Sequence, residues 1–340
     1  MKRILTGDRP TGKMHIGHYF GTLKNRIALQ NEYEQFVMIA NIQALTDNFD
    51  NPSKIRNSIQ DLILDYYAVG IDFEKTTIFI QSEIPEIHEI FIYLANFATI
   101  QQVSQNPTIK QELNDKSADH NFSKSTPLGF FIYPIHQAAD ILCVNADLVP
   151  VGKDQAPMVE GCRDLARKFN DTYNTEILKL PEALFGVSHN VPGFDGHIKM
   201  GKSLSNAIYL SDTDERISEC IKKTKTDPAR IHADTPGDPS QSVVFTYLDL
   251  LNSTQSDGGM DQELSNMKED YKKGIISDKT TKEYLNMKMK EFISPIREKR
   301  IEGEKIQSEL FDKVLSNTKT VRSIARQVAD NMKECMQINF

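Results

Sequence analysis

Two histidines, His15 and His18, lie three residues apart in the stretch TGDRPTGKMHIGHYFG, residues 6–21. Glycines and a proline surround them, so a flexible turn precedes the point where a helical pattern begins. Two imidazoles at such a place could clamp a metal ion, contact phosphate groups, or be ordinary polar residues that open a helix. The stretch alone leaves these three interpretations open.

The metal interpretation has little support from the rest of the chain. A zinc site usually adds a third ligand at a recognisable spacing, and the sequence has no HExxH motif. The four cysteines are scattered without a CxxC pair, which argues against a thiolate metal site and against a disulfide framework.

The phosphate interpretation fits the local chemistry better. A glycine-rich turn lets the backbone approach a ligand closely, and the N-terminus of a helix offers unpaired N–H groups and a partial positive charge. The stretch has neither the GxGxxG spacing of a dinucleotide site nor the GK[ST] ending of a Walker A loop. A phosphate site here would therefore be of another type.

A second cationic cluster occurs about 180 residues later, in HIKMGKSLSN, residues 197–206. Two small or flexible residues separate Lys199 from the adjacent Lys202 and Ser203, as in a mobile loop that closes on a leaving pyrophosphate. Taken alone it would be an unremarkable lysine-rich loop. Its pairing with HIGH resembles the HIGH and KMSKS signature pair of class I aminoacyl-tRNA synthetases.

Further segments narrow the resemblance to the tryptophanyl-tRNA synthetase family. These segments are LTGDRPTGKMHIGHYFGTLKNR, NPTIKQE, IYPIHQAADIL, LVPVGKDQ and KMGKSLSNAIYLSD, and the resemblance covers essentially the whole chain. AADIL followed by VPVGKDQ separates this family from tyrosyl-tRNA synthetases, which usually have a different pattern around the DQ pair.

The resemblance implies a two-step reaction with ATP as co-substrate. The tryptophan carboxylate attacks the α-phosphate of ATP, with Mg²⁺ held mainly by the ATP and no metal ligands on the protein, and the tryptophanyl group then passes to tRNA(Trp). Positioning and stabilisation of phosphate charge are the protein's main tasks. The implied catalytic residues are His15, His18, Lys110, Lys199, Lys202 and Ser203. The implied ATP-binding residues are Arg9, Thr11, Gly12, Gly17, His18, Gly152, Asp154, Lys199, Met200 and Lys202.

The resemblance also implies which residues bind tryptophan. Asp140 would accept a hydrogen bond from the indole N–H, and its apolar neighbours in AADIL suggest a dry location, although an aspartate that caps or pairs within that segment is the alternative. Lys110 fits equally well as an exposed lysine without a role in binding. Val149 and Val151 fit equally well as ordinary core residues of a strand. The other implied tryptophan-binding residues are Leu5, Gly7, Gln43, Tyr133, Gln137, Val149, Val151 and Gln155.

Three positions depart from the family pattern. Gly201 replaces the middle serine of KMSKS, which removes a hydroxyl donor and loosens the loop. Gln137 stands where many bacterial relatives have methionine and could add a polar contact to the ring. Arg9 stands where many relatives have glutamine, so a guanidinium replaces the amide that makes the contact there.

The elements that position these residues alternate between strands and helices. Apolar runs at RILTG, EQFVMIANI, TTIFIQ and DLVPVG predict strands, and helical spacing follows each of them. Asn51–Pro52 and Gly70 are start and stop signals for one of these helices. The alternation predicts an α/β fold with a Rossmann-like doubly wound parallel sheet, followed by a second, α-helical domain.

The expected domain division places the catalytic domain at residues 1–190. Residues 191–304 would form the signature lysine loop and a helical anticodon-binding domain, and a final helix over about 305–340 would pack back on the catalytic domain. The polar segment 110–126 is interpreted as a mobile insertion, a candidate active-site flap.

Composition sets limits on the class of protein. With 340 residues, 39% hydrophobic and 26% charged, the chain is typical of a globular protein, and it lacks an apolar run of membrane-spanning length. A net charge of −7 gives no global nucleic-acid signal, although lysines and arginines gather at 222–225 and 288–300. A cytoplasmic location is expected, and the family resemblance implies a homodimer.

Other functions remain as alternatives. They are a tyrosyl-tRNA synthetase, a small nucleotidylyltransferase, and a non-charging regulator built on a synthetase fold. The length of the chain and the second lysine loop argue against the nucleotidylyltransferase. The presence of both signature motifs argues against the regulator.

Overall fold

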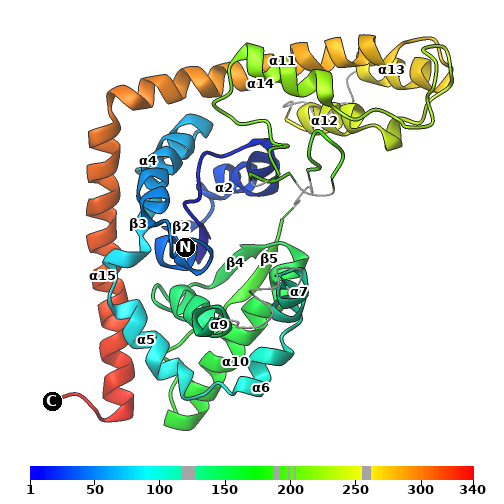
Figure 1. The fold of residues 1–340 in the computed structure, drawn as a ribbon. Helices are drawn as coiled ribbons and strands as arrows, with labels where there is room; N and C mark the ends of the chain where they lie inside the picture. Colours follow the sequence, from blue (N-terminus) through cyan, green and yellow to red (C-terminus); the bar gives the residue numbers. More distant parts are fainter. Residues whose placement is uncertain (117–126, 187–190, 198–199, 203, 255–261) are drawn as a thin grey trace.

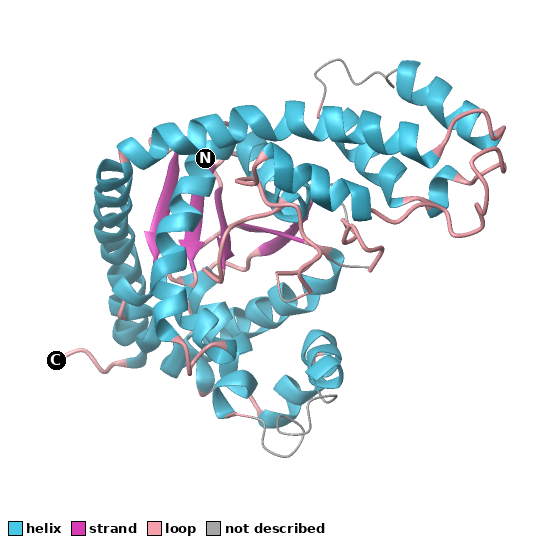
Figure 2. Cartoon of the chain, turned by 45° about the horizontal axis from the view of Figure 1, so that its top comes forward, coloured by secondary structure: helices cyan, strands magenta, loops and turns pink. Residues whose placement is uncertain are grey.

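The computed structural model describes residues 1–116, 127–186, 191–197, 200–202, 204–254 and 262–340. These residues form one parallel sheet, helices on both of its faces, and a helical arm (Figures 1 and 2). The strands are β1 (Arg3–Asp8), β2 (Glu34–Ile39), β3 (Thr76–Ile80), β4 (Leu148–Val151) and β5 (Glu182–Phe185). The predicted α/β fold with a parallel sheet and an added helical part is confirmed.

The strand order is β3-β2-β1-β4-β5, and every pairing is parallel. The chain moves outward from β1 to β3 and then crosses to the other side of β1 with β4. This reversal creates a topological switch point at the carboxyl ends of β1 and β4, which is where open α/β sheets bind ligands. The edge strand β5 was not predicted from the sequence.

Helices fill the connections and build the arm. Their bounds are α1 (Ile16–His18), α2 (Lys24–Leu29), α3 (Asn41–Ala44), α4 (Pro52–Val69), α5 (Glu86–Ala95), α6 (Ile100–Gln105), α7 (Pro107–Lys116), α9 (Leu128–Leu142), α10 (Ala156–Tyr173), α11 (Asp214–Lys223), α12 (Val243–Asn252), α13 (Gln262–Lys272), α14 (Asp278–Lys305) and α15 (Gln307–Met336). A π-helical turn over Tyr19–Leu23 joins α1 to α2.

The central strands are buried on both faces, which explains their continuous apolar runs. Val37 and Ile39 of β2 face a core formed with α4, α14 and the arm, whereas Phe36 and Met38 face a core formed with α5, α9, α10 and α15. The period of two along the strand thus divides its side chains between two hydrophobic layers.

The signals at the ends of α4 act as predicted. The Asn51 side chain accepts a hydrogen bond from the Lys54 N–H, Pro52 occupies the first turn, and Gly70 ends the helix with a left-handed φ of 98°. Within the segment 110–126, interpreted as a mobile insertion and candidate flap, residues 110–116 belong to the helix α7, and the flap role stays a prediction. Residues 117–126 lie outside the described part of the chain.

Two long helices connect the arm to the sheet. Helix α14 runs from the arm onto α4, and α15 then passes along β3 and α5, on the left side of Figure 1. The Thr318 hydroxyl of α15 accepts a hydrogen bond from the Ile80 N–H of β3 at 3.1 Å. This contact satisfies a donor at the edge of the sheet, where unpaired strand groups are otherwise exposed. None of the described helices is long and apolar enough to span a membrane.

Candidate active site

A cleft of about 380 Å³ opens at the carboxyl ends of β1 and β4. Its walls come from the turn after β1, from β2, α4 and α9, and from the lysine segment near residue 202. The lining residues are Leu5, Thr6, Gly7, Asp8, Arg9, Thr11, Gly12, Met14, His18, Met38, Ala40, Gln43, Leu62, Gln137, Asp140, Ile141, Val149 and Lys202. The cleft therefore lies at the switch point of the sheet, where a ligand is expected.

The turn after β1 is held by backbone contacts to distant segments. The Met14 N–H donates to an Asp65 carboxylate oxygen at 2.7 Å, and Gly12 takes a left-handed φ of 125°. Met14 and Ile16 also exchange backbone hydrogen bonds with Leu210 and Ile208. These bonds join the histidine stretch to the segment that directly follows the lysine cluster, so the two signature segments lie side by side.

His15 and His18 form a tilted ring pair at the start of α1, with 46° between the ring planes. Their ring centroids are 3.8 Å apart, and the His15 backbone N–H donates to Nδ1 of His18 at 3.1 Å. Burial lowers the pKa of His15 to about 2 and that of His18 to about 4, so both rings are neutral at pH 7. Neutral imidazoles can donate N–H hydrogen bonds without a proton transfer, which suits contacts to phosphate oxygens.

Gly17 is required for this arrangement. A Cβ at position 17 would lie 2.8 Å from Nδ1 of His15, closer than carbon and nitrogen can approach without moving the ring. The described residues include no cluster of three or more His, Cys, Asp and Glu side chains suited to a metal ion. Contact of the two imidazoles with phosphate groups stays a prediction.

Lys202 reaches back to the turn after β1. Its Nζ donates to the Gly12 carbonyl at 2.7 Å and lies 3.4 Å from the Thr11 hydroxyl. Burial lowers the pKa of Lys202 to about 8, although the carboxylates of Asp8 and Asp65 oppose the shift. A partly desolvated ammonium in a cleft attracts an anion more strongly than one in water.

A buried charge pair lies beneath this end of the cleft. Arg26 forms an ion pair with Asp8, and the Tyr66 hydroxyl donates to the same carboxylate at 2.6 Å. Burial alone would raise the pKa of Asp8, but Arg26 and Tyr66 lower it below its usual value. Asp8 is therefore ionised, and its charge is compensated inside the protein.

Asp140 is the buried carboxylate at the other end of the cleft, with a side chain that is 1% exposed. Gln43 and Gln81 each donate a side-chain N–H to it at 2.8 Å, one to each oxygen. Nδ1 of His136 lies 3.6 Å from the oxygen that Gln43 contacts. The two amides hold the carboxylate in place, and lone pairs remain for a further donor from the cleft.

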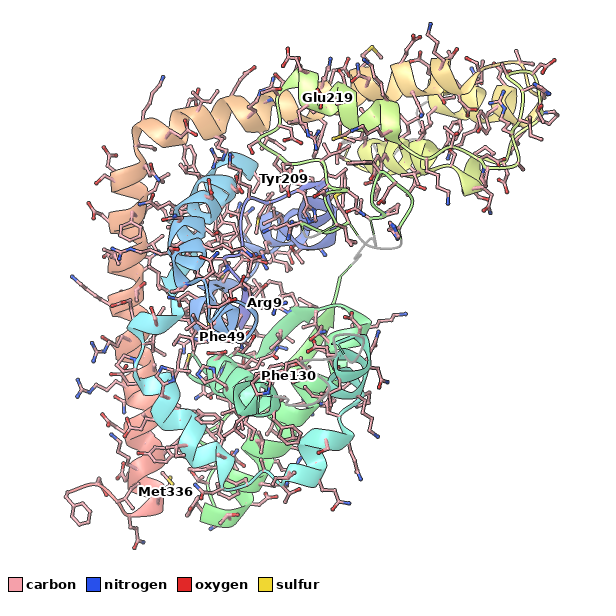
Figure 3. All side chains as sticks on the ribbon, viewed as in Figure 1. Arg9, Phe49, Phe130, Tyr209, Glu219 and Met336 are labelled. Carbon is pink, nitrogen blue, oxygen red and sulfur yellow. The ribbon has the colours of Figure 1, made fainter. Side chains whose placement is uncertain are left out.

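A second hollow of about 250 Å³ adjoins the first, because Arg9, Gln43 and Gln137 line both. Its remaining lining residues are Thr46, Glu112, Phe130, Tyr133 and Gln155. Figure 3 labels Arg9 and Phe130, which lie near the middle of the molecule. Helix α7 contributes Glu112, so the segment expected to be a loop contributes a wall of this hollow.

Most of the predicted site residues are brought together by the fold. Those that line the cleft or the second hollow are Leu5, Gly7, Arg9, Thr11, Gly12, His18, Gln43, Tyr133, Gln137, Asp140, Val149, Gln155 and Lys202. Lys199 and Ser203 lie outside the described residues. The predicted residues that line neither hollow are His15, Gly17, Lys110, Val151, Gly152, Asp154 and Met200.

These remaining residues differ in their surroundings. His15, Gly17 and Met200 pack directly behind the cleft, since a Cβ on Gly17 would be 3.6 Å from that of Met200. Val151 is half-buried against the core, and Asp154 is exposed beyond β4. Lys110 is an exposed residue of α7. Contact of these last three with a ligand stays a prediction.

Sequence reasoning missed several lining residues. Thr6, Asp8 and Met14 line the cleft and lie within residues 6–21, the segment that contains the two histidines. Their closeness to the histidines in the sequence could have predicted this. Gln81 and His136 support Asp140 from behind, and no motif marks Gln81 as more than the residue after a strand. Glu112 lies in a polar segment, and no motif in the sequence marks it as a lining residue.

Comparison with known proteins gives consistent matches. Residues 1–294 match the family model described as tRNA synthetases class I (W and Y). The tryptophan–tRNA ligase of Streptococcus pneumoniae serotype 4 is 42% identical over 342 residues, covering 99% of this chain and 98% of that protein. The enzyme of the same name from Lactococcus lactis is also 42% identical, with the same coverage.

Among solved structures, the chain resembles tryptophanyl-tRNA synthetase from Campylobacter jejuni in complex with ADP and tryptophan. The TM-score is 0.83 at 29% identity, and the match covers 98% of this chain and 99% of the other. The similarity therefore extends over the sheet, the cleft and the arm together.

Proposed function

This chain belongs to the class I tRNA synthetases of the tryptophan and tyrosine type, and we propose that within this family it acts as a tryptophan–tRNA ligase. It is an aminoacyl-tRNA ligase that activates L-tryptophan with ATP, releases pyrophosphate, and transfers the tryptophanyl group to the 3′-terminal ribose of tRNA(Trp).

The main support for tryptophan as the amino-acid substrate is the buried Asp140 carboxylate in the cleft. It is held by two amide donors and presents its remaining lone pairs to a cleft that also contains Leu5 and Val149 as apolar walls. An indole ring matches an apolar slot that ends in an acceptor. An amino acid without a donor at that position would cover the carboxylate without adding a hydrogen bond to those from Gln43 and Gln81, which costs roughly 1–3 kcal/mol.

The phosphate end of the cleft supports the activation step. The tryptophan carboxylate forms a bond to the α-phosphorus of ATP while the bond to the bridging oxygen breaks and pyrophosphate leaves. Neutral His15 and His18 donate hydrogen bonds, and Lys202 supplies positive charge where negative charge develops. A preorganised donor of this kind typically contributes about 3 kcal/mol in the transition state.

The other ligands and partners follow from the family. The similar Campylobacter jejuni structure is a complex with ADP and tryptophan, which supports binding of ATP beside the amino acid. Mg²⁺ would be carried by the phosphates of ATP and would offset their charge. Lys199, Ser203 and Lys110 would contact the same phosphates, and Gly152 and Asp154 would contact the nucleotide.

Several larger features are also part of the proposal. Residues 1–190 act as the catalytic domain with α15 packed on it, and residues 191–304 carry the lysine loop and bind the anticodon of tRNA(Trp). The protein is a cytoplasmic homodimer in which one tRNA contacts both subunits. Sedimentation analysis of the free chain and of its tRNA complex tests the dimer and its tRNA stoichiometry, and a monomer that binds one tRNA would contradict the dimer.

Pyrophosphate exchange into ATP tests the function. The exchange is run with tryptophan, tyrosine or no amino acid, and only tryptophan should support it. Asp140→Ala should reduce the efficiency with tryptophan by about 100-fold and leave ATP binding nearly unchanged. Exchange with tyrosine alone would make the protein a tyrosyl enzyme, and no exchange with either amino acid would favour a regulator.

A further inference from the structure

The second hollow carries a pair of opposite charges. Among the described residues that line it, Arg9 has a guanidinium group and Glu112 a carboxylate, and none of the others has an amine, guanidinium or carboxylic group. Arg9 follows β1 and lines the cleft as well, whereas Glu112 lies on α7. One cation and one anion in a hollow of amino-acid size complement a zwitterion, which has the same two charges.

We propose that Glu112 accepts hydrogen bonds from the α-ammonium group of the amino acid and that Arg9, at the junction of the two hollows, pairs with its carboxylate. This inference rests on the proposed function and deepens it, because it assigns how the site recognises the amino-acid backbone as distinct from the ring.

The position of Glu112 fits this role. The Tyr133 hydroxyl donates to one Glu112 oxygen at 3.0 Å, which holds the carboxylate against α9. Tyr133, Gln137 and Asp140 follow one another at spacings of four and three, so they share a face of that helix. Seven residues of helix correspond to a rise of roughly 10 Å.

That rise matches the length of the substrate. A tryptophan molecule that reaches Asp140 with its indole N–H must place its ammonium and carboxylate near Tyr133. A ligand that donates to Asp140 with its indole N–H would then place its ammonium beside Tyr133 and the Glu112 carboxylate that Tyr133 contacts. The carboxylate then lies beside Arg9, where the cleft with His18 and Lys202 begins.

The negative charge of Glu112 would bind an ammonium group more strongly than the neutral residues around it can. Tyr133 and Gln155 offer dipoles, and charge-assisted hydrogen bonds are roughly twice as strong as neutral ones. An ammonium group brought out of water without a counter-charge would raise the cost of binding. Arg9 and Glu112 together would therefore favour binding of α-amino acids over indole compounds that lack the ammonium or the carboxylate group.

The alternative role for Glu112 is purely structural, as the acceptor that orients Tyr133. Glu112→Gln separates the two roles, because the amide oxygen can still accept from the Tyr133 hydroxyl while the negative charge is removed. Arg9→Gln removes the positive charge in the same way. Glu160→Gln, an exposed acid on α10, is the matched control.

The experiment measures binding of three indole ligands to each variant. L-tryptophan has both charged groups, tryptamine lacks the carboxylate, and indole-3-propionate lacks the ammonium. The chain contains no tryptophan, so indole fluorescence excited beyond the tyrosine absorption reports the ligand alone. Thermal unfolding of each variant checks that it is folded, and calorimetry gives a second measure of affinity.

Glu112→Gln should weaken the binding of L-tryptophan and of tryptamine by about 10- to 100-fold, and the binding of indole-3-propionate should be unchanged or tighter. Arg9→Gln should weaken L-tryptophan and indole-3-propionate and spare tryptamine. Equal weakening of all three ligands by Glu112→Gln, or no change, would overturn the inference. If the unaltered protein binds tyrosine and not tryptophan, the proposed function itself fails, which is a separate result.

Discussion

The Gln81 side-chain nitrogen lies 2.8 Å from an oxygen of the Asp140 carboxylate, although 59 residues separate the two in the sequence. Gln81 is fully buried, and its own amide oxygen accepts hydrogen bonds from the Ile42 and Gln43 N–H groups. Gln43 in turn donates to the other oxygen of Asp140. One glutamine thus supports the carboxylate directly and also positions the second residue that holds it.

Gln81→Met should therefore raise the KM for tryptophan by about 10- to 100-fold while the KM for ATP changes by less than about threefold. The substitution keeps the volume but removes the amide donor from one Asp140 oxygen and the acceptor from two backbone N–H groups, while Gln43 still donates to the other Asp140 oxygen. Pyrophosphate exchange at varied tryptophan and ATP gives both constants. Gln35→Met is the control, since Gln35 is equally buried and donates to Thr76 away from the cleft. The same tryptophan effect in both variants would mean a general loss of stability.

Strand and helix positions could be predicted where the local sequence pattern agrees with the tertiary packing. The four strands seen in the sequence have continuous apolar runs because both faces of the sheet are covered. The missed strand β5 has four residues, begins with Glu182, and leaves Phe185 exposed at the edge of the sheet. Its pairing with β4 stabilises it, and that information is not local.

Helix α7 was missed for a different reason. Asn106 accepts a hydrogen bond from the Thr108 N–H, and Pro107 occupies the first helical position, so a helix start signal was present. The polar composition after Lys110 suggested a loop instead. Asp140 was identified through family resemblance, whereas Gln81 and Asp65 act through contacts that depend on the register of β3 and on the packing of α14. Such contacts have no sequence signature.

The affinity for ATP should depend on the titration of Lys202. Its pKa is lowered to about 8 by burial, so a growing fraction of the free protein has a neutral Lys202 above that pH. Bound phosphate favours the charged form, and binding above pH 8 therefore requires uptake of a proton. The Kd for ATP should rise by up to about tenfold per pH unit above 8.

Lys202→Arg keeps the positive charge throughout this range, because the guanidinium does not lose its proton. Calorimetric binding of ATP from pH 7 to 9.5 should show the bend near pH 8 in the unaltered protein and no bend in the variant. The phosphates of ATP titrate below this range and do not contribute. An unchanged bend in Lys202→Arg would assign the titration to another group.

Acid should destabilise the protein in part through the buried histidines. The pKa of His18 is about 4 in the folded protein and about 6.5 in an unfolded chain, so the unfolded state binds the proton first as the pH falls. The stability that the neutral His18 contributes is present in full above pH 6.5 and is lost progressively between pH 6.5 and 4. The limiting slope is about 1.4 kcal/mol per pH unit for each such histidine.

His18→Asn should reduce the difference in unfolding free energy between pH 7 and pH 5 by up to about 2 kcal/mol. Urea unfolding at several pH values measures it. His232→Asn, at an exposed histidine, should leave the difference unchanged. If the two variants show the same pH dependence, the burial of His18 has no effect on acid stability.

Arg300 should be essential for stability and for the position of the turn after β1. Arg300 is 6% exposed, and its guanidinium contacts Asp65 at 2.9 Å, Asp61 at 2.6 Å and Glu304 at 2.7 Å, while Asp65 accepts from the Met14 N–H. Arg300→Met leaves a buried carboxylate without its partner. We expect a loss of about 3–5 kcal/mol in unfolding free energy and a higher KM for ATP.

Arg216→Met provides the comparison for Arg300→Met. Arg216 is exposed on α11 and pairs with Glu219 at 3.0 Å, and removal of such a surface pair should cost less than about 1 kcal/mol. Denaturant unfolding and ATP kinetics are measured for both variants. Similar effects of the two substitutions would show that the contacts of Arg300 with α4 contribute little.

Gly17→Ala should reduce the rate of tryptophan activation by about 100-fold with little effect on stability. The new Cβ would lie 2.8 Å from Nδ1 and 2.9 Å from Cε1 of His15, so the ring must move away from the position it shares with His18. A displacement of about 1 Å in such a group typically costs this much in rate. Gly21→Ala, four residues later in the same helical segment, meets no atom within 4 Å.

Gly17 lies in α1 and Gly21 in the π-helical turn that follows it, and the comparison rests on what each added Cβ would touch. Gly21→Ala should keep full activity and stabilise the protein by roughly 0.5–1 kcal/mol, as expected for removal of a glycine from a helix. Pyrophosphate exchange and thermal unfolding of both variants measure the two effects. Because His15 lies behind the cleft and does not line it, a normal rate in Gly17→Ala would mean that only His18 has to be in place for activation.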